Sequence, residues 1–389
     1  MRIAAIEVFF LRYDYPEDLK YRFIGGRVEA LDVAVVRVTA ESGEYGIGEL
    51  TFGQFTYEPI VGLVTHFGRL LAGHPVERIT HAWEIMYLSS AFWNRAGLGI
   101  AVMGAINMAM YDLVGKIRGV PVHALLGGFV RPRARVYASN GLFTDAEELV
   151  ADVRRAEAAG FDGYKLRVVS TKTIVDQLTA FRDTVGDGMD VMVDAVQGAV
   201  SVPWSMGVAR RLPRDIEPFA PAWLEEPVRI ENLDGWASVR DQSRVNIAGA
   251  ESIPTAFAFR PYLERGAFDI LQFDIATAAF TEGTRIGHLA AVHGLPVALH
   301  SWGTAISIAA GIHMALVMPN CTITEYNFTR HPLNDLLFAE PLRIEDGHVA
   351  APTTPGLGLR FDPEWVKEYP YEAAASTLTL VEDRDIQLS

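Results

Sequence analysis

Four short apolar runs between residues 191 and 274 decide the fold: VMVDA (191–195), AWLEEP (222–227), VNIAGAE (245–251) and FDILQFD (268–274). Each run carries an acidic residue at or near its end, and a stretch of helical periodicity separates it from the next. Runs of this length, rich in β-branched and aromatic side chains, are typical of buried strands. The pattern therefore predicts repeated β/α units with parallel strands.

The same pattern continues on both sides of this stretch. VYASN (136–140) and YKLRVV (164–169) precede it, and PVALHS (296–301) and TITEYN (322–327) follow it, which makes eight predicted strands. Successive polar residues near the strand ends are 29, 31, 26, 23, 26 and 25 residues apart, the length of one strand plus one helix. These polar residues are Lys165, Asp194, Glu225, Glu251, Asp274, His300 and Glu325.

Eight units of nearly constant period predict an α/β barrel of the TIM type, which usually takes roughly 250 residues. A doubly wound open sheet is the alternative, but it normally has fewer strands, and the sequence offers no Gly-rich phosphate loop. Before the barrel, residues 1–12 and 30–41 have the composition of strands, and the pattern from residue 60 to residue 125 is helical. We therefore predict a separate α+β domain over residues 1–130 and the barrel over residues 131–355.

Composition and charge narrow the class of protein. Of 389 residues, 50% are hydrophobic and 21% are charged, as in soluble proteins with a large core. The net charge of −14 argues against a nucleic acid or an anionic membrane as partner. The single cysteine, Cys321, suits a reducing cytoplasm, and Asn107 and Asp112 interrupt the most apolar stretch, which argues against a membrane span. With no pattern of a signal peptide at the N-terminus, we expect a cytoplasmic enzyme or binding protein.

Three acidic residues end three successive predicted strands: Asp194, Glu225 and Glu251. In a barrel the carboxyl ends of the strands converge on the active site. Any one of these residues, taken singly, is more simply a surface acid at a strand-to-loop junction. Three in consecutive strands, each after a run that should be buried, favour a site for one hard divalent cation such as Mg²⁺, because a cation relieves their mutual repulsion.

Candidate proton carriers lie at the other strand ends. Lys165 and Arg167 are two residues apart on one strand, so both side chains should point into the barrel mouth, where they could also form ion pairs with the acids. Asp274 ends one strand and His300 the next, so the carboxylate could orient the imidazole and raise its basicity. A lone histidine after an apolar strand is more often a core residue whose ring nitrogens are hydrogen-bonded within the fold. With Asp274 as its partner, a catalytic role for His300 is about as well supported as this structural one.

As a set, these motifs resemble the enolase superfamily, in its mandelate racemase-like subgroup. The resemblance covers nearly the whole chain: AINMAMYDLVGKIRGVPVHALLGG (105–128) is similar to the segment before that family's barrel, and YKLR to its Lys-x-Lys strand. VDAVQ, LEEP and AGAES are similar to its three metal-ligand strands. The resemblance implies a (β/α)7β barrel capped by an α+β domain that residues 356–389 complete. It also implies substrate selection by the loops of residues 21–26 and 52–57, and a homo-oligomer of up to eight subunits.

Roles for individual residues follow from the same resemblance. It implies one Mg²⁺ per subunit on Asp194, Glu225 and Glu251, the first Glu of LEEP being the ligand. Asp274 and His300 correspond to the family's dyad, and Glu325 to an acid that hydrogen-bonds a substrate carboxylate oxygen. The common step is abstraction of the proton α to a carboxylate, with the resulting enediolate stabilised by Mg²⁺. Members of the superfamily use a Lys or His side chain as the base for this step.

One residue departs from the racemase pattern: Arg167 stands where the second lysine serves as a base. A guanidinium stays charged at neutral pH and is a poor general base. Single-base abstraction by His300 and β-elimination from a sugar acid, as in the family's acid-sugar dehydratases, therefore fits better than racemisation or epimerisation. A galactarolactone cycloisomerase, which expels a ring oxygen, is the close alternative.

Two other classes remain open from the sequence. A barrel glycosidase could use Glu225 and Glu251 as its pair of carboxylates, although the seventh strand ends in His300 and activity would then survive a chelator. A non-catalytic protein that binds sugar acids would require a broken site, and each of the expected positions is present. The substrate, a small carboxylate such as a sugar acid or its lactone, cannot be identified further from the sequence.

Overall fold

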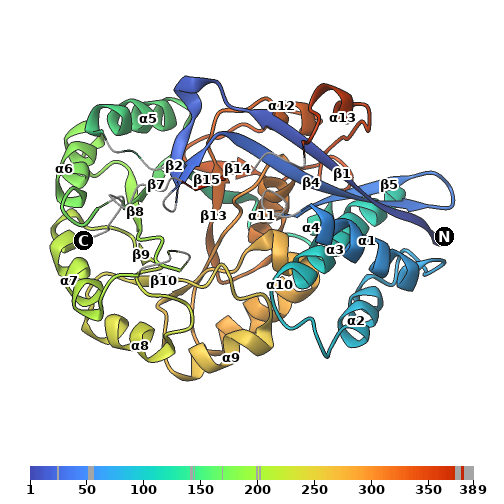
Figure 1. Cartoon of the computed structure of the whole chain (residues 1–389), viewed down its shortest axis with the longest axis horizontal. Helices are drawn as coiled ribbons and strands as arrows, with labels where there is room; N and C mark the ends of the chain where they lie inside the picture. Colours follow the sequence, from blue (N-terminus) through green and yellow to red (C-terminus); the bar gives the residue numbers. More distant parts are fainter. Residues whose placement is uncertain are drawn as a thin grey trace.

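The computed structural model describes residues 1–23, 26–50, 57–140, 143, 145–168, 170–198, 200, 203–372 and 378–380. Parts of both loops predicted to select substrate, residues 24–25 and 52–56, lie outside the described residues. Figure 1 shows a barrel ringed by helices and, against it, a smaller unit of strands and helices that includes the N-terminus.

The barrel consists of eight parallel strands. In chain order they are β6 (Arg133–Ser139), β7 (Gly163–Arg167), β8 (Asp190–Asp194), β9 (Leu224–Glu225), β10 (Ile247–Gly249), β11 (Ile270–Leu271), β12 (Val297–Leu299) and β13 (Cys321–Asn327). Each pairs with the next, and β13 pairs back with β6, so the sheet closes. The predicted barrel is confirmed and the open sheet is excluded, because a doubly wound sheet has two free edges.

Seven helices alternate with these strands in the described part of the chain, as a (β/α)7β barrel requires. They are α5 (Ala146–Ala158), α6 (Ile174–Val185), α7 (Met206–Ile216), α8 (Leu233–Gln242), α9 (Ala256–Glu264), α10 (Ile275–Val292) and α11 (Ala305–Val317). Side chains of Asp145, Ser205, Asn232, Thr255, Asp274 and Thr304 cap their N-termini by accepting backbone N–H bonds. After β13 come α12 (Leu333–Leu337) and β14 (His348–Ala350), which pairs antiparallel with β6.

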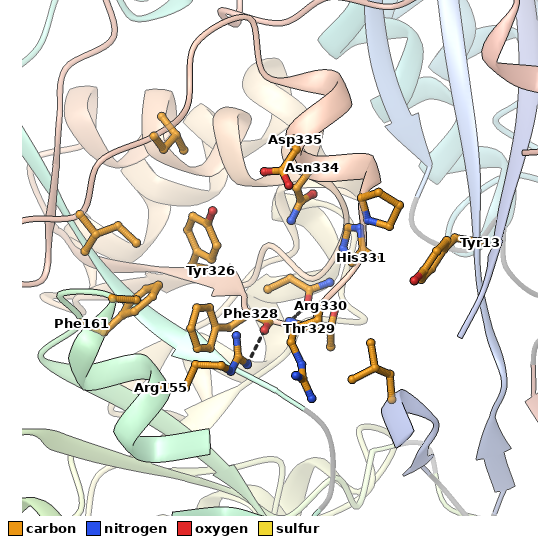
Figure 2. Close-up of a pocket in the computed structure, with 16 residues that line it drawn as sticks. Tyr13, Arg155, Phe161, Tyr326, Phe328, Thr329, Arg330, His331, Asn334 and Asp335 are labelled. Carbon is orange, nitrogen blue, oxygen red and sulfur yellow. Dashed lines mark hydrogen bonds between the residues drawn. The ribbon is translucent and has the colours of Figure 1, made fainter. Parts of the chain in front are cut away.

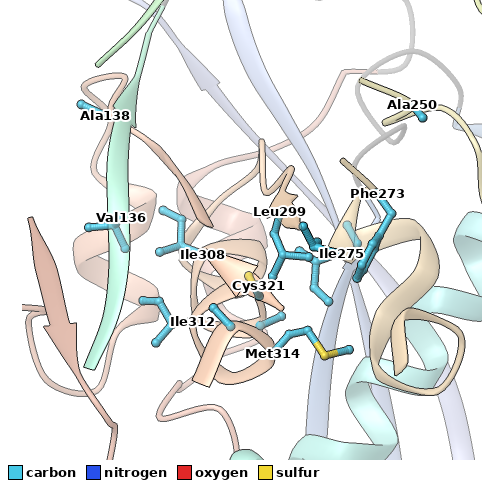
Figure 3. Packing of buried hydrophobic residues seen from close by; sticks show 14 of the residues in the cluster. Val136, Ala138, Ala250, Phe273, Ile275, Leu299, Ile308, Ile312, Met314 and Cys321 are labelled. Atoms are coloured by element: carbon cyan, nitrogen blue, oxygen red, sulfur yellow. The ribbon is translucent and has the colours of Figure 1, made fainter. Parts of the chain in front are cut away.

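The barrel has one apolar layer inside and another outside its strands. Inside, one buried cluster fills the space below the strand ends: Tyr137, Met192, Trp223, Ala248, Ala298 and Ile323. Outside, side chains of the helices pack on the other faces of the strands; Figure 3 shows Ile308 and Ile312 of α11 facing Val136 of β6. With both faces buried, the middle of the sheet is mostly apolar, and charged side chains stand toward the strand ends, as Arg133 and Asp190 do at the end away from the mouth.

The smaller unit packs an antiparallel sheet against three helices. Strands β1 (Ile3–Asp14), β4 (Ala30–Ala40) and β5 (Tyr45–Leu50) form the sheet. Helices α1 (Glu58–Leu71), α2 (Ile79–Ser89) and α3 (Leu98–Arg118) share its core, which makes this unit the predicted α+β cap. The chain's late segments join it: α13 (Trp365–Glu368) contacts β1, and β15 (Leu378–Leu380) pairs with β3 (Gly26–Val28). The exact domain boundaries at residues 130 and 355 stay a prediction.

Short elements complete the description. They are η1 (Glu17–Leu19), β2 (Tyr21–Phe23), α4 (Val122–Leu125) and η3 (Glu217–Phe219). Strand β2 pairs with β3, so β2, β3 and β15 form a small sheet of their own.

Helix α3 joins the cap to the barrel. By length and composition alone it could span a membrane, but 89% of its most apolar window is buried inside the protein. Two of its buried polar residues are satisfied there: Asn107 exchanges two hydrogen bonds with Thr281 of α10, and Asp112 accepts the backbone N–H groups of Ile47 and Leu357. Gly104 allows the closest approach, because a Cβ atom built on it would lie 2.3 Å from the carbonyl oxygen of Thr277.

Replacing Gly104 by alanine is expected to lower the free energy of unfolding by about 1–3 kcal/mol, since the added methyl group must push α3 away from α10. The matched control is Gly62→Ala, at an exposed position of α1 where a Cβ atom meets nothing within 4 Å. That variant should be as stable as the original chain, or more stable by up to about 1 kcal/mol. Urea unfolding of both variants measures the difference; equal midpoints would contradict the proposed close contact.

Candidate active site

The barrel mouth brings all the sequence-predicted site residues together. They are Lys165, Arg167, Asp194, Glu225, Glu251, Asp274, His300 and Glu325. Backbone pairing sets part of this arrangement, since Arg167 lies opposite Asp194 and Asp194 opposite Glu225 in neighbouring strands. Seven of the eight are buried, and only the Glu251 side chain is substantially exposed, at 40%.

Lys165 lies at the centre of the charged groups. Its Nζ is 2.7 Å from Glu225 Oε1, 2.9 Å from Glu325 Oε1 and 3.7 Å from Asp194 Oδ2. Burial by itself lowers the pKa of Lys165, but Glu225 and Glu325 raise it well above the usual value, so the ammonium group is charged. A lysine with a raised pKa is better suited to bind an anionic group than to take a proton.

Asp194 and Glu225 form the second feature of the mouth. Burial and the neighbouring Glu225 raise the pKa of Asp194 to about 7, against the opposing charges of Lys165 and Arg167. Glu225 is anchored through its other oxygen, since Oε2 accepts hydrogen bonds from Trp223 Nε1 at 2.9 Å and Gln272 Nε2 at 3.0 Å. The fold therefore holds two carboxylates side by side despite their repulsion.

Glu251, the third predicted ligand, turns toward His300. Its Oε2 is 3.2 Å from His300 Nε2, although Glu251 also contributes to the raised pKa of Asp194. Among the residues that the structure describes, no three His, Cys, Asp or Glu side chains are arranged to hold a metal ion. The three carboxylates nevertheless suit a hard divalent cation. Such cations prefer oxygen ligands, and these three negative charges lie close enough to one another at the barrel mouth to repel.

The backbone next to all three acids is strained. Val196, Glu226 and Ala250 have positive φ angles of 54°, 48° and 89° without being glycine. Each lies within two residues of one of the acids, and such conformations cost of order 1–3 kcal/mol apiece. Unfavourable backbone at three successive strand ends indicates that the local structure serves the position of these carboxylates and not the stability of the loops.

His300 and Asp274 form a directed pair. His300 Nδ1 is 2.8 Å from Asp274 Oδ2, while Asp274 Oδ1 accepts the backbone N–H of Thr277 at the start of α10. This geometry leaves His300 Nε2 toward Glu251 and Glu325. Burial lowers the pKa of His300, but Glu251, Glu325 and Asp274 together raise it to about 10.

Arg167 and Glu325 complete the ring. The guanidinium of Arg167 stacks on Trp302, 4.2 Å from the ring centroid, with Nε 3.6 Å from Asp194 Oδ2. Glu325 Oε2 accepts the backbone N–H of Ser301. Burial would raise the pKa of Glu325, but Lys165, His300 and Arg167 hold it well below its usual range. In this arrangement Glu325 is ionised, so it can accept a hydrogen bond but cannot donate one. Its implied role, donating a hydrogen bond to a carboxylate oxygen of the substrate, stays a prediction.

The sequence pattern did not point to two buried residues that contact the site or the segment next to it, Gln272 and Glu49. Gln272 could have been found, because it lies two residues before Asp274 in the predicted strand of residues 268–274, where alternation places both on the same face. Glu49 gave no signal, since its contacts lie 255 and 258 residues further along the chain. The pose of Trp302 on Arg167 was likewise not visible in the sequence.

A separate cavity of about 520 Å³ lies outside this ring, between α5, η1 and the segment after β13. Figure 2 shows its labelled side chains, with Phe161 and Phe328 beside Arg155 and with His331 and Asn334 on another wall. None of the eight predicted residues is among those that line it. The candidate active site is therefore the charged barrel mouth and not this cavity.

Comparisons with known proteins agree with this geometry. Residues 148–365 match the family model described as "Enolase C-terminal domain-like", and residues 16–127 match "Mandelate racemase / muconate lactonizing enzyme, N-terminal domain". The chain is 28% identical to D-galactarolactone cycloisomerase of Agrobacterium fabrum, over 95% of this chain and 99% of that protein. It is 31% identical to L-rhamnonate dehydratase of Saccharopolyspora erythraea, over 92% and 90%.

Among solved structures, a racemase from Streptomyces coelicolor A3(2) with bound magnesium superimposes with a TM-score of 0.84 at 25% identity. The match covers 94% of this chain and 99% of that one. Fold and sequence therefore point to the same group of proteins over nearly the whole length of the chain.

Proposed function

Because this chain is an enolase-superfamily enzyme of the mandelate racemase/muconate lactonizing enzyme family, we propose that it is an acid-sugar dehydratase. It would remove the proton α to the carboxylate of a sugar acid and then expel the β-hydroxyl group. A dehydratase and a lactone cycloisomerase are both among its relatives, and the same dyad would serve either reaction.

The observation that carries the proposal is one imidazole directed by a buried carboxylate into a ring of charged groups. Asp274 holds His300 Nδ1 at 2.8 Å, so the second ring nitrogen is left for chemistry. The ring's other cations, Lys165 and Arg167, are less suited to be the base: Lys165 Nζ is held by Glu225 and Glu325 at 2.7 and 2.9 Å, and a guanidinium does not release a proton at neutral pH. A single base supports elimination better than two-base racemisation.

In the first step His300 Nε2 takes the α-proton, and the C–H electron pair moves toward the substrate carboxylate. Lys165 and Arg167 bind that carboxylate by charge, and Asp274 stabilises the imidazolium that forms. When bound by Asp194, Glu225 and Glu251, Mg²⁺ would supply positive charge beside the developing anion and offset the Glu251 charge that raises the pKa of His300.

In the second step the electron pair forms a double bond between the α and β carbons while the β C–O bond breaks. The proton held by His300 goes to the departing oxygen, which leaves as water, and the enol product tautomerises to a 2-keto-3-deoxy acid. If the β-oxygen belongs to a lactone ring, the same transfer opens the ring and the enzyme acts as a cycloisomerase.

Further properties belong to the same proposal. We infer one Mg²⁺ per subunit, a small carboxylate substrate and a homo-oligomeric, cytoplasmic enzyme, with the loops of residues 21–26 and 52–57 selecting the substrate. The bound magnesium of the Streptomyces coelicolor racemase supports the metal. The glycosidase and non-catalytic alternatives are set aside, because the relatives reported above are a cycloisomerase and a dehydratase.

The test is a screen of the purified enzyme with Mg²⁺ in deuterated water against aldonates, aldarates and their lactones. We expect 2-keto-3-deoxy acid, with loss of one water, from at least one free aldonate or aldarate. Keto acid formed from a lactone with no change of molecular mass would identify a cycloisomerase. A 2-hydroxy acid without a β-leaving group, followed by chiral chromatography, should take up deuterium with retained configuration. Interconversion of its enantiomers would refute the single-base argument and make the enzyme a racemase or epimerase.

A further inference from the structure

Glu49 of the cap is buried against the barrel. It lies in β5 and is only 3% exposed, yet its carboxylate contacts no basic side chain among the interactions of the described residues. Instead, Glu49 Oε1 accepts the backbone N–H of Thr304 at 2.9 Å. Oε2 accepts the Thr304 hydroxyl at 3.0 Å, the Ser307 N–H at 3.1 Å and the Ser307 hydroxyl at 2.9 Å. Four donors from one barrel helix therefore converge on one carboxylate of the cap.

These donors are the first turn of α11. The amide N–H groups at a helix N-terminus lack partners within the helix and carry partial positive charge, so a buried carboxylate there is well matched. The bonds from Thr304 and Ser307 lower the pKa of Glu49, but burial outweighs them and raises it above its usual value. Gly303 leaves room for the contact, because a Cβ atom on it would lie 2.5 Å from Ser307 Oγ and 3.0 Å from Glu49 Oε1.

The turn held by Glu49 follows directly on the proposed base. Residues 300–304 run from His300 through Trp302, which stacks on Arg167, to Thr304. The barrel holds the same segment from its other side, since Glu325 accepts the N–H of Ser301 and Asn327 Nδ2 donates to the Gly303 carbonyl. Only Glu49 reaches this segment from the cap among these contacts. Displacing the turn would move Trp302 and the stacked Arg167, and misplacement by about 1 Å can cost a hundredfold in rate.

We propose that Glu49 is a positioning residue that locks the cap onto the start of α11 and thereby sets the Trp302–Arg167 pair beside His300. The inference rests on the proposed function for its kinetic consequence but not for the contact itself. Glu49 touches none of the eight residues of the charged ring, so it acts through the 300–304 segment.

The test uses Glu49→Gln, which keeps the size of the side chain but turns an NH₂ group toward backbone N–H donors. With a substrate from the screen, kcat should fall at least about tenfold while KM changes by less than about threefold, since orientation is lost more than binding. Glu49→Gln combined with Ser307→Ala should lose little more than Glu49→Gln alone. The matched control is Val64→Ala, which loosens the buried cluster of the cap at a residue of α1.

Hydrogen–deuterium exchange of residues 301–307, followed by mass spectrometry, tests the contact without any substrate. Faster exchange in Glu49→Gln than in Val64→Ala, at equal melting temperature, would support the proposal even if the wild-type enzyme turned over no sugar acid. Unchanged exchange, an unchanged kcat, or an equal loss of kcat in Val64→Ala at that melting temperature would overturn it.

Discussion

Replacing His300 by asparagine is expected to lower kcat by about a hundredfold to ten-thousandfold, since positioned general acid–base catalysis contributes roughly that factor. The same variant should stop exchange of the substrate α-proton with deuterated solvent, because His300 Nε2 is the proposed acceptor of that proton. Asparagine can keep a polar contact to Asp274, so the barrel should stay folded. Proton NMR in deuterated water follows exchange and product formation together.

Two further variants sharpen this prediction. Asp274→Asn should give a milder loss, because it removes the orienting carboxylate 2.8 Å from Nδ1 and leaves the imidazole in place. His293→Asn, at an exposed histidine that follows α10, is the matched control and should keep wild-type activity. Loss of product with exchange intact in His300→Asn would make His300 only the acid and transfer proton abstraction to the Lys165 face.

Replacing Glu251 by glutamine is expected to abolish Mg²⁺-dependent turnover and the stabilisation of the fold by Mg²⁺. A ligand at about one hundred times its dissociation constant stabilises the folded state by about 2.7 kcal/mol, which is visible as a rise in melting temperature. The amide of the variant is uncharged and a weaker ligand for a hard cation, so both the rise and the activity should disappear.

The control for this variant is Glu264→Gln, which removes an exposed carboxylate paired with Arg260 on α9. It should keep the Mg²⁺-dependent rise in melting temperature. Titration calorimetry with Mg²⁺ provides a readout that does not depend on substrate. Normal Mg²⁺ binding and wild-type activity in Glu251→Gln would show that the proposed ligand set is wrong.

Much of the barrel and its site was visible in the sequence, for a physical reason. A barrel strand buried on both faces must be apolar until it reaches the mouth, so the first charged residues after each run mark the strand ends. Asp194, Glu225 and Glu325 could be placed in this way, because parallel strands bring their carboxyl ends to one edge. Alternation along a strand likewise predicted that Lys165 and Arg167 share a face, and both are buried in the mouth.

The sequence pattern therefore predicted which residues form the charged ring, but it did not predict which of them contact one another. Which acid Lys165 contacts, the turn of Glu251 toward His300 and the stack of Trp302 on Arg167 depend on side-chain positions that only the closed barrel sets. Glu49 is the extreme case: its partners lie more than 250 residues away, on another unit of the molecule. The periodicity of a chain reports which residues each element buries, but contacts between elements arise only when those buried faces meet.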